Sequence, residues 1–250
     1  MKRTISAAFL GLVIWGCQPA TSDNTTAENT ATAVAEKSNS ASSEADGQCL
    51  FEYQTRLDQL LTKDEIAQHF PEDLSKATYK YETKYAPVNY QQAIYTWPSE
   101  RIRKLKIGDR TMEVPSHNRL GVGDISQYKP DQNALNIFKS SYRTLTEEEK
   151  VKAREAMQEG LEKHTKDDGK KLSDTEKKAG NTLGGSLTDM AQFDSFEGIG
   201  DAAAWDAMDR ALIVLKGRTV FRIYADVSAD PQENKALAKK LAEVVLAKCK

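Results

Sequence analysis

Residues 211–225 read ALIVLKGRTVFRIYA, two apolar runs joined at Lys216-Gly217. Each run is short and holds β-branched or aromatic residues, a pattern typical of buried strands. The glycine supplies the backbone freedom that a tight connection needs. The stretch therefore predicts an antiparallel hairpin, with strands over residues 211–215 and 219–225.

The residues after this hairpin predict a helix. Asp230 is a good N-cap, Pro231 suits the first helical position, and Glu233 would complete a capping box. Apolar residues then recur at helical spacing, so one face is expected to pack on the sheet as far as about residue 248. These positions are Leu237, Leu241, Val244 and Val245.

The start of the folded part also predicts helix. Leucines and isoleucine in residues 50–70 keep near-helical spacing, and Pro71 ends the pattern. Thr62 and Glu65 form a second capping box, so a new helix can begin there.

Strand patterns follow at 78–85, 93–97, 101–107, 111–114 and 135–138, with a hairpin turn at Gly108-Asp109. Residues 146–164 predict a mostly solvated helix that begins with a capping box at Thr146. Residues 166–186 are either a mobile connection or a frayed helix from Ser173 onward. Together these elements predict an α+β fold, an antiparallel sheet of short hairpins with N-terminal and C-terminal helices packed on it.

One short motif occurs twice. Gly121-Val122-Gly123-Asp124 stands eleven residues before Leu135, and Gly198-Ile199-Gly200-Asp201 stands eleven before Leu212. A duplication would give two similar halves, each with a Gly-x-Gly-Asp turn that leads into a strand. Coincidence in a turn-biased motif is the other interpretation.

The N-terminal segment, MKRTISAAFLGLVIWGC in residues 1–17, has the layout of a secretory signal. Two basic residues precede an apolar run that is too short to span a bilayer. The segment Ile14-Trp15-Gly16-Cys17 resembles the lipobox of bacterial lipoproteins. This resemblance implies removal of residues 1–16 and a lipid on Cys17. The alternative is an ordinary signal peptide with a chance cysteine at its end.

Residues 17–48 are expected to be the lipidated cysteine and a disordered tether, because they are rich in Ser, Thr, Ala, Asn and Glu and hold no aromatic residue. Residues 49–250 then form a single extracytoplasmic domain. Gln18, and not Asp, follows the cysteine. By the same resemblance, an outer membrane is favoured where the organism has one.

The remaining cysteines, Cys49 and Cys249, stand at the two ends of the predicted domain. An exported protein meets an oxidising compartment, and the ends of a domain often lie close together. We therefore expect a structural disulfide between them, the alternative being two separate thiols.

Composition and motifs exclude several functions. The net charge of −2 gives no sign of nucleic-acid binding. His69, His117 and His164 are scattered and belong to no ligand motif, so neither a metal nor another cofactor is expected. Ser186 lacks the Gly-x-Ser-x-Gly context of a hydrolase nucleophile, and no catalytic residue is predicted.

Aromatic residues gather in the strand-rich stretch, and four of them make a candidate ligand face: Tyr79, Tyr81, Tyr95 and Trp97. Exposed rings in a row could stack on a sugar or a peptide. The alternative is cross-strand packing of the sheet against a helix.

The segment 198–205, the hairpin after it and the last helix are similar to the end of several families of small secreted bacterial lipoproteins. Residues 61–66, LTKDEI, are similar to their opening helix. The resemblance implies a compact domain for binding or sensing outside the cytoplasm.

We therefore expect a membrane-anchored envelope lipoprotein whose domain is a non-enzymatic binding or interaction module. Its expected partners are the membrane, through the lipid, and a protein or glycan of the envelope. A structural or stress-response role without a small ligand is the first alternative, and an envelope hydrolase with a dispersed site is the second.

Overall fold

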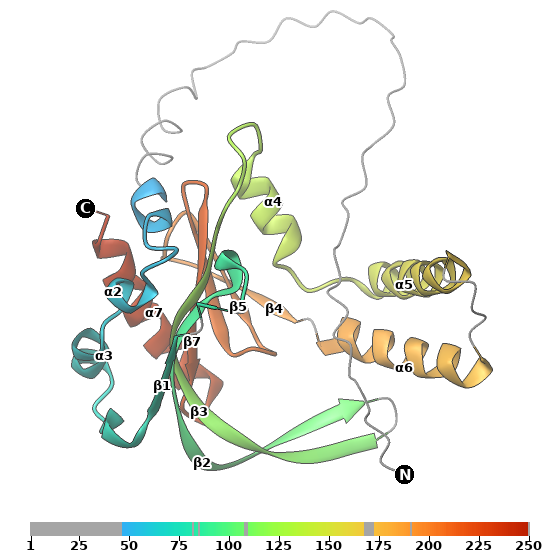
Figure 1. The fold of residues 1–250 in the computed structure, drawn as a ribbon, viewed down its shortest axis with the longest axis horizontal. Coiled ribbons are helices and arrows are strands. Elements are labelled where there is room, and N and C mark those ends of the chain that lie inside the picture. Colours follow the sequence, from blue (N-terminus) through green and yellow to red (C-terminus); the bar gives the residue numbers. More distant parts are fainter. Residues whose placement is uncertain are drawn as a thin grey trace, which may run out of the picture. The chain divides into compact units, whose positions relative to one another are not determined.

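The structure, a computed structural model, describes residues 47–81, 83–84, 86–107, 110–167, 173–190 and 192–249. In this part of the chain, one antiparallel sheet has the strand order β1-β2-β3-β7-β6-β5-β4 (Figure 1). The predicted α+β class, with an antiparallel sheet and helices at both ends, is confirmed. The strands are β1 (Thr78–Tyr81), β2 (Gln92–Ile107), β3 (Arg110–Gln127), β4 (Phe193–Phe196), β5 (Ala202–Asp206), β6 (Ala211–Lys216) and β7 (Thr219–Asp226).

Two meanders make up the sheet, β1 to β3 and β4 to β7, and they join where β3 pairs with β7. The hairpin predicted from residues 211–225 is present as β6 and β7. Its register runs from Ala211 opposite Tyr224 to Lys216 opposite Thr219. The two apolar runs of this hairpin therefore lie at the centre of the sheet.

One face of the sheet carries the main hydrophobic core. Side chains of alternate residues point to it from each strand, and helices α2 (Leu57–Leu60), α3 (Lys63–His69) and α7 (Pro231–Ala247) lie over it (Figure 1). Burial of each large aliphatic side chain there stabilises the fold by roughly 1.5–3 kcal/mol. The core residues on β7 and α7 are Phe221, Ile223, Ala225, Leu237, Ala238, Leu241, Ala242 and Val245.

The N-terminal part of helix α7 differs from the prediction in one detail. The Asp230 side chain accepts from the backbone N–H of Gln232, as expected of the N-cap. Glu233 does not complete a capping box with Asp230. Its carboxylate accepts from the Ser228 hydroxyl at 2.5 Å, which in turn accepts from the Asp230 N–H. Ser228 therefore links the two residues that the pattern had paired directly.

Residues 50–70 do not form a continuous helix. The chain makes separate short helices, α2 and α3, with an extended residue at Leu61 between them. The cause is local, because Thr62 caps α3 through the predicted capping box with Glu65. The break turns Leu57, Leu60 and Ile66 together into the core.

Helix α4 (Ala134–Ser141) lies on the other face of the sheet, so the strand predicted at 135–138 is wrong. Asn133 initiates a helix by accepting the N–H of Asn136 at 3.0 Å. Ala134 and Phe138 are four residues apart and point the same way on a helix, toward the sheet. A short apolar run of this kind fits either a helix or a strand, and here the Asn133 cap favours the helix.

Helices α5 (Glu147–Asp167) and α6 (Asp174–Met190) pack against each other. The capping box at Thr146 is confirmed by reciprocal bonds with Glu149. Of the alternatives for residues 166–186, the structure has the helix, which begins directly after Ser173. The Ser173 hydroxyl accepts the Glu176 N–H, and the Glu176 carboxylate accepts the Ser173 N–H. Residues 168–172 lie outside the described part.

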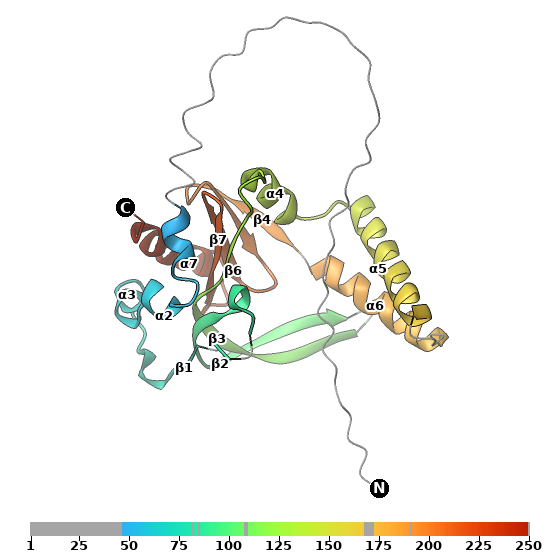
Figure 2. The ribbon, with the colours of Figure 1, turned by 45° about the horizontal axis from the view of Figure 1, so that its top comes forward.

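The strands predicted at 93–97, 101–107 and 111–114 are parts of two much longer strands, β2 and β3, and not short hairpins. A bulge between Pro98 and Ile102 lets β2 continue past the proline. Ser99 holds this bulge, because its hydroxyl donates to Ser116 O at 2.5 Å and accepts the Arg101 N–H at 3.2 Å. The far ends of both strands leave the sheet as a two-stranded ribbon (Figure 2). The predicted turn, Gly108-Asp109, lies outside the described residues.

The expected disulfide between Cys49 and Cys249 is present, with the Cα atoms 5.6 Å apart. This separation is the usual one for a disulfide. The bond joins the start of the described chain to the end of α7. Residues 1–46, with the predicted leader, Cys17 and most of the tether, lie outside the described part. Among the helices that are described, none combines the length and apolar character of a membrane span.

Candidate functional site

A network of polar side chains occupies the second face of the sheet, beside the patch that α4 covers. It begins on β7, where side chains alternate between the faces. Phe221, Ile223 and Ala225 enter the main core. Arg222, Tyr224 and Asp226 point the other way and meet partners from β2, β3 and the β5–β6 turn.

Tyr224 is the buried centre of this network, with only 1% of its surface exposed. Its hydroxyl donates to the carboxylate of Asp124 and accepts from Gln92 Nε2 at 2.8 Å. Burial, and then the adjacent Asp124, raises the pKa of the Tyr224 hydroxyl. The tyrosine is therefore held as a neutral hydrogen-bond donor.

Gly121 explains how Tyr224 can reach Gln92. Gly121 is the strand partner of Tyr224 on β3, and Gln92 belongs to β2 beyond it. The tyrosine side chain therefore crosses β3 where β3 has no side chain. A Cβ atom on Gly121 would lie 2.2 Å from Ala93 O, so any larger residue would collide with the β2 backbone.

Arg222 connects the tyrosine to the β5–β6 turn. Its Nη1 lies 3.0 Å from Asp209 Oδ2 and 3.3 Å from Asp206 Oδ2, and its Nε lies 3.6 Å from Asp124 Oδ2. Burial raises the pKa of Asp206. Asp206 Oδ1 also accepts the backbone N–H groups of Met208 and Asp209, which fixes the turn.

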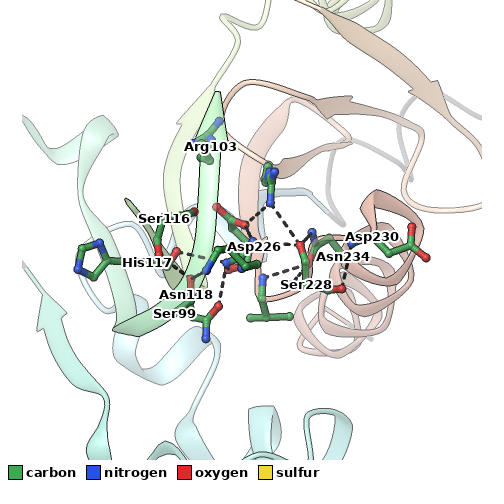
Figure 3. A network of polar contacts seen from close by, with 12 residues as sticks. Ser99, Arg103, Ser116, His117, Asn118, Asp226, Ser228, Asp230 and Asn234 are labelled. Carbon is green, nitrogen blue, oxygen red and sulfur yellow. Dashed lines mark hydrogen bonds and ion pairs between the residues drawn. The ribbon is translucent and has the colours of Figure 1, made fainter. Parts of the chain in front are cut away.

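The second half of the network centres on Asp226, whose side chain is 8% exposed (Figure 3). Arg101 forms an ion pair with Asp226 Oδ1, and Arg210 Nη1 lies 2.6 Å from the same oxygen. Arg101 Nη2 also donates to Asn118 Oδ1 at 2.8 Å. Asp226 therefore ties the bulge in β2 to β7 and to the β5–β6 turn.

A fully buried asparagine anchors the same corner to α7 (Figure 3). Asn234 Oδ1 accepts the N–H groups of Val227 and Ser228, and its Nδ2 donates to Ser228 O at 2.8 Å. Ser228 O accepts from Arg101 as well. The end of β7, the start of α7 and the arginine network thus share one set of backbone groups.

Two further arginines border this corner. Arg103 Nη2 donates to Met208 O at 2.7 Å, in the β5–β6 turn. The Arg119 guanidinium carbon lies 4.0 Å from the centroid of the Tyr224 ring, a cation–π contact. We call Arg101, Arg103, Arg119 and Arg210 the arginine cluster.

The aromatic residues expected to form a ligand face lie elsewhere, on the face that bears the helices. Tyr79 stacks on Tyr95 with the ring centroids 4.7 Å apart, and Trp97 contacts Phe70 at 5.7 Å. Tyr81, Tyr95 and Trp97 are half-buried against the main core, and Tyr79 is 42% exposed. The geometry favours the packing alternative. The strand predicted over 78–85 ends at Tyr81, and Tyr85 lies outside the described residues.

The repeated Gly-x-Gly-Asp motif has two different structures. Gly121 to Asp124 lie inside β3, whereas Gly198 to Asp201 form a turn before β5, with positive φ at both glycines. Leu135 lies in helix α4, and Leu212 lies in strand β6. The expectation of a turn in each half is therefore wrong for the first copy. The strand register, and not the motif itself, decides its conformation.

The second copy borders a hollow of about 520 Å³ between α4 and β4. Asp201 fixes this turn, because its Oδ2 accepts the Gly217 N–H at 2.6 Å. Rings from both elements line the hollow, and Arg143 at its edge is already paired with Glu149. The aromatic residues of the lining are Phe138, Tyr142, Phe193 and Phe196.

The structure offers no support for a metal site in the part that it describes, where no group of three or more potential ligand residues gathers. His69 is on α3 and His117 on β3. The Ser186 hydroxyl donates to Thr182 O within α6 at 3.0 Å.

No protein-family model, curated protein or solved structure matches this chain. A function for this chain must therefore be inferred from its own sequence and structure. Sequence reasoning missed the residues of the polar network, although one signal was present. Arg222 stands in the middle of a strand whose other residues are nearly all apolar, which indicates a polar face that needs partners.

Proposed function

We propose that this chain is a lipid-anchored lipoprotein of the bacterial cell envelope and that its folded domain is a non-enzymatic binding module. The observation that carries the proposal is the pairing of Cys49 with Cys249. The sequence has three cysteines, so this pair leaves Cys17 as the remaining one. Cys17 stands in the lipobox-like segment, where a free thiol is what lipidation needs.

The disulfide also supports export. Such bonds form and persist in oxidising compartments, and they are rare where thiols are kept reduced. Here the bond closes a loop of 200 residues, nearly the whole folded part. A domain locked in this way, attached through a tether to a lipid, is suited to hold a rigid surface near a membrane.

Binding is favoured over catalysis by the state of the polar network. Its carboxylates are engaged: Asp124, Asp206 and Asp226 each accept hydrogen bonds and pair with an arginine. A general base must present a free lone pair to its substrate. A binding surface needs only donors held in fixed positions, which this network provides.

Labelling of cells with palmitate tests the anchor. We expect label on the wild-type protein and none on Cys17→Ser, with Cys49→Ser as the matched control that keeps its label. Membrane fractionation of the same cells should place the wild type with membranes and release Cys17→Ser. Undiminished label on Cys17→Ser, or no label on the wild type, would refute the lipoprotein assignment.

A further inference from the structure

In the described chain, the arginine cluster has more guanidinium groups than carboxylate partners. Arginine stays protonated at any physiological pH. Asp226 is the one carboxylate that lies within ion-pair distance of these arginines in the described part of the chain. These four arginines therefore have one described carboxylate partner, Asp226, while the neighbouring Asp124, Asp206 and Asp209 pair with Arg222.

The arginines of the cluster are close neighbours. Arg101 and Arg210 both reach the same oxygen of Asp226. Arg119 is the strand partner of Asp226 in the β3–β7 ladder. Arg103 contacts the carbonyl of Met208, two residues before Arg210 in the β5–β6 turn. Strands β2 and β3 and the β5–β6 turn thus contribute guanidinium groups to the same corner of the sheet.

Arg101 and Arg210 have a structural role, since Asp226 and Ser228 O hold them. In the part of the chain that the structure describes, Arg119 is not held by a carboxylate or a carbonyl in this way. Within the described residues its contact is the stack on Tyr224, and no carboxylate or carbonyl accepts its N–H groups. A stacked guanidinium keeps its donors at the rim of the plane, where they form the fork that matches an oxyanion.

We propose that the arginine cluster binds a phosphate group, with Arg119 and Arg103 as the donors and with Arg101 and Arg210 held behind them by Asp226. The proposal rests on the binding module proposed above and names its ligand class. A phosphate monoester carries up to two negative charges and several acceptor oxygens, so it can pair with guanidinium groups that have no carboxylate partner of their own. The group can belong to a soluble phosphate ester or to a lipid headgroup.

Calorimetric titration of the mature full-length chain in nonionic detergent tests this, at pH 7.5 and low, constant ionic strength. The probes are inorganic phosphate and water-soluble dihexanoyl phosphatidate. We expect binding of at least one probe by the wild type. Arg119→Gln should weaken it about tenfold or more, and Arg119→Lys, which keeps the charge and loses the fork, should fall between.

Arg56→Gln is the matched control. Arg56 also stacks on a tyrosine, with its guanidinium carbon 5.1 Å from the Tyr53 ring centroid, but it lies among the N-terminal helices and not in the cluster. This variant should bind like the wild type. Should Arg119→Gln fail to fold, Arg103→Gln takes its place, with the same expected loss.

The probes separate the sources of phosphate. Binding of phosphatidate at least tenfold tighter than inorganic phosphate indicates a lipid headgroup, and similar affinities indicate a soluble phosphate ester. Absence of binding with both probes, or equal binding by Arg119→Gln and the wild type, would overturn the phosphate site. Palmitate on Cys17 would then be unaffected, so this failure is distinguishable from failure of the lipoprotein assignment.

Discussion

The hydroxyl of Tyr224, on β7, donates a hydrogen bond to the carboxylate of Asp124, near the C-terminal end of β3 and 100 residues earlier in the chain. Asp124 has a positive φ of 52°, at the irregularity where the β3–β7 register shifts. This bulge turns the carboxylate toward the tyrosine. The contact joins the two meanders of the sheet through side chains as well as through the backbone ladder.

The Tyr224 crossing depends on the absence of a side chain at Gly121. Gly121→Ala should lower the free energy of unfolding by about 3 kcal/mol or more, because its Cβ would collide with backbone atoms of β2 that cannot move independently. Urea unfolding followed by circular dichroism measures the loss. Gly160→Ala is the control, since nothing lies within 4 Å of a Cβ at that position in α5. It should raise stability by roughly 0.5–1 kcal/mol, as for an exposed helical glycine. Equal effects of the two substitutions would contradict the assignment.

Asp226 should be costly to remove. Asp226→Asn leaves Arg101 and Arg210 without their shared counter-charge, and we expect a loss of about 3 kcal/mol in the free energy of unfolding. The comparison is Glu113→Gln, which breaks an ion pair with Lys104 whose side chains are both mostly exposed. That variant should stay within about 0.5 kcal/mol of the wild type. A loss at Glu113 as large as that at Asp226 would argue against a special role for the buried pair.

The disulfide should contribute strongly to stability. Replacing Cys49 and Cys249 together by Ser opens a loop of 200 residues, and the chain-entropy relation gives roughly 5 kcal/mol for a closed loop of this length. Thermal unfolding of the double variant should therefore occur at a markedly lower midpoint. Reduction of the wild type by dithiothreitol should reproduce that midpoint, and should leave the double variant unchanged. An unaltered wild-type midpoint under reduction would show that the bond constrains little.

Glu65 should contribute to the acid dependence of stability. Burial alone would raise the pKa of its carboxyl, but hydrogen bonds from Lys248 and Thr62 outweigh this and lower the pKa below the ordinary value of 4.5. A carboxyl whose pKa is lower in the folded state stabilises the protein above the unfolded pKa, and this contribution is lost as pH falls through the folded pKa. The stability difference between the wild type and Glu65→Gln should thus be constant from about pH 6 to 7 and shrink below pH 4.5. Urea unfolding between pH 3 and 7 measures it. Glu243→Gln, at an exposed position on α7, is the matched control. A Glu65→Gln curve that runs parallel to that of the wild type over the whole range would contradict the prediction.

Features that depend on a few neighbouring residues were predictable. The hairpin in residues 211–225 was evident from its two apolar runs, and the helix starts at Thr62, Thr146 and Asp230 were evident from their capping residues. The disulfide followed from the count and placement of the cysteines. Each of these rests on local sequence or on chain ends, where distant parts of the fold have little influence.

Features that depend on strand pairing were not predictable. The continuity of β2 through Pro98 requires a partner strand and the hydrogen bonds of Ser99. The helix α4 and the conformation of Gly121 to Asp124 were also not predicted correctly, because the sequence of a short segment is compatible with more than one secondary structure. The pairing of β3 with β7 selects the conformation in the last case.

The sequence by itself determined the hairpin of β6 and β7, the capped starts of α3, α5 and α7, the antiparallel α+β class and the pairing of Cys49 with Cys249. The tertiary structure alone decided the polar network and the arginine cluster. Arg101, Arg119 and Arg210 come from separate strands and turns, and nothing in their sequence spacing relates them. They meet because the sheet places β3 beside β7. The interaction between charges depends on their distance in space and not on their order along the chain.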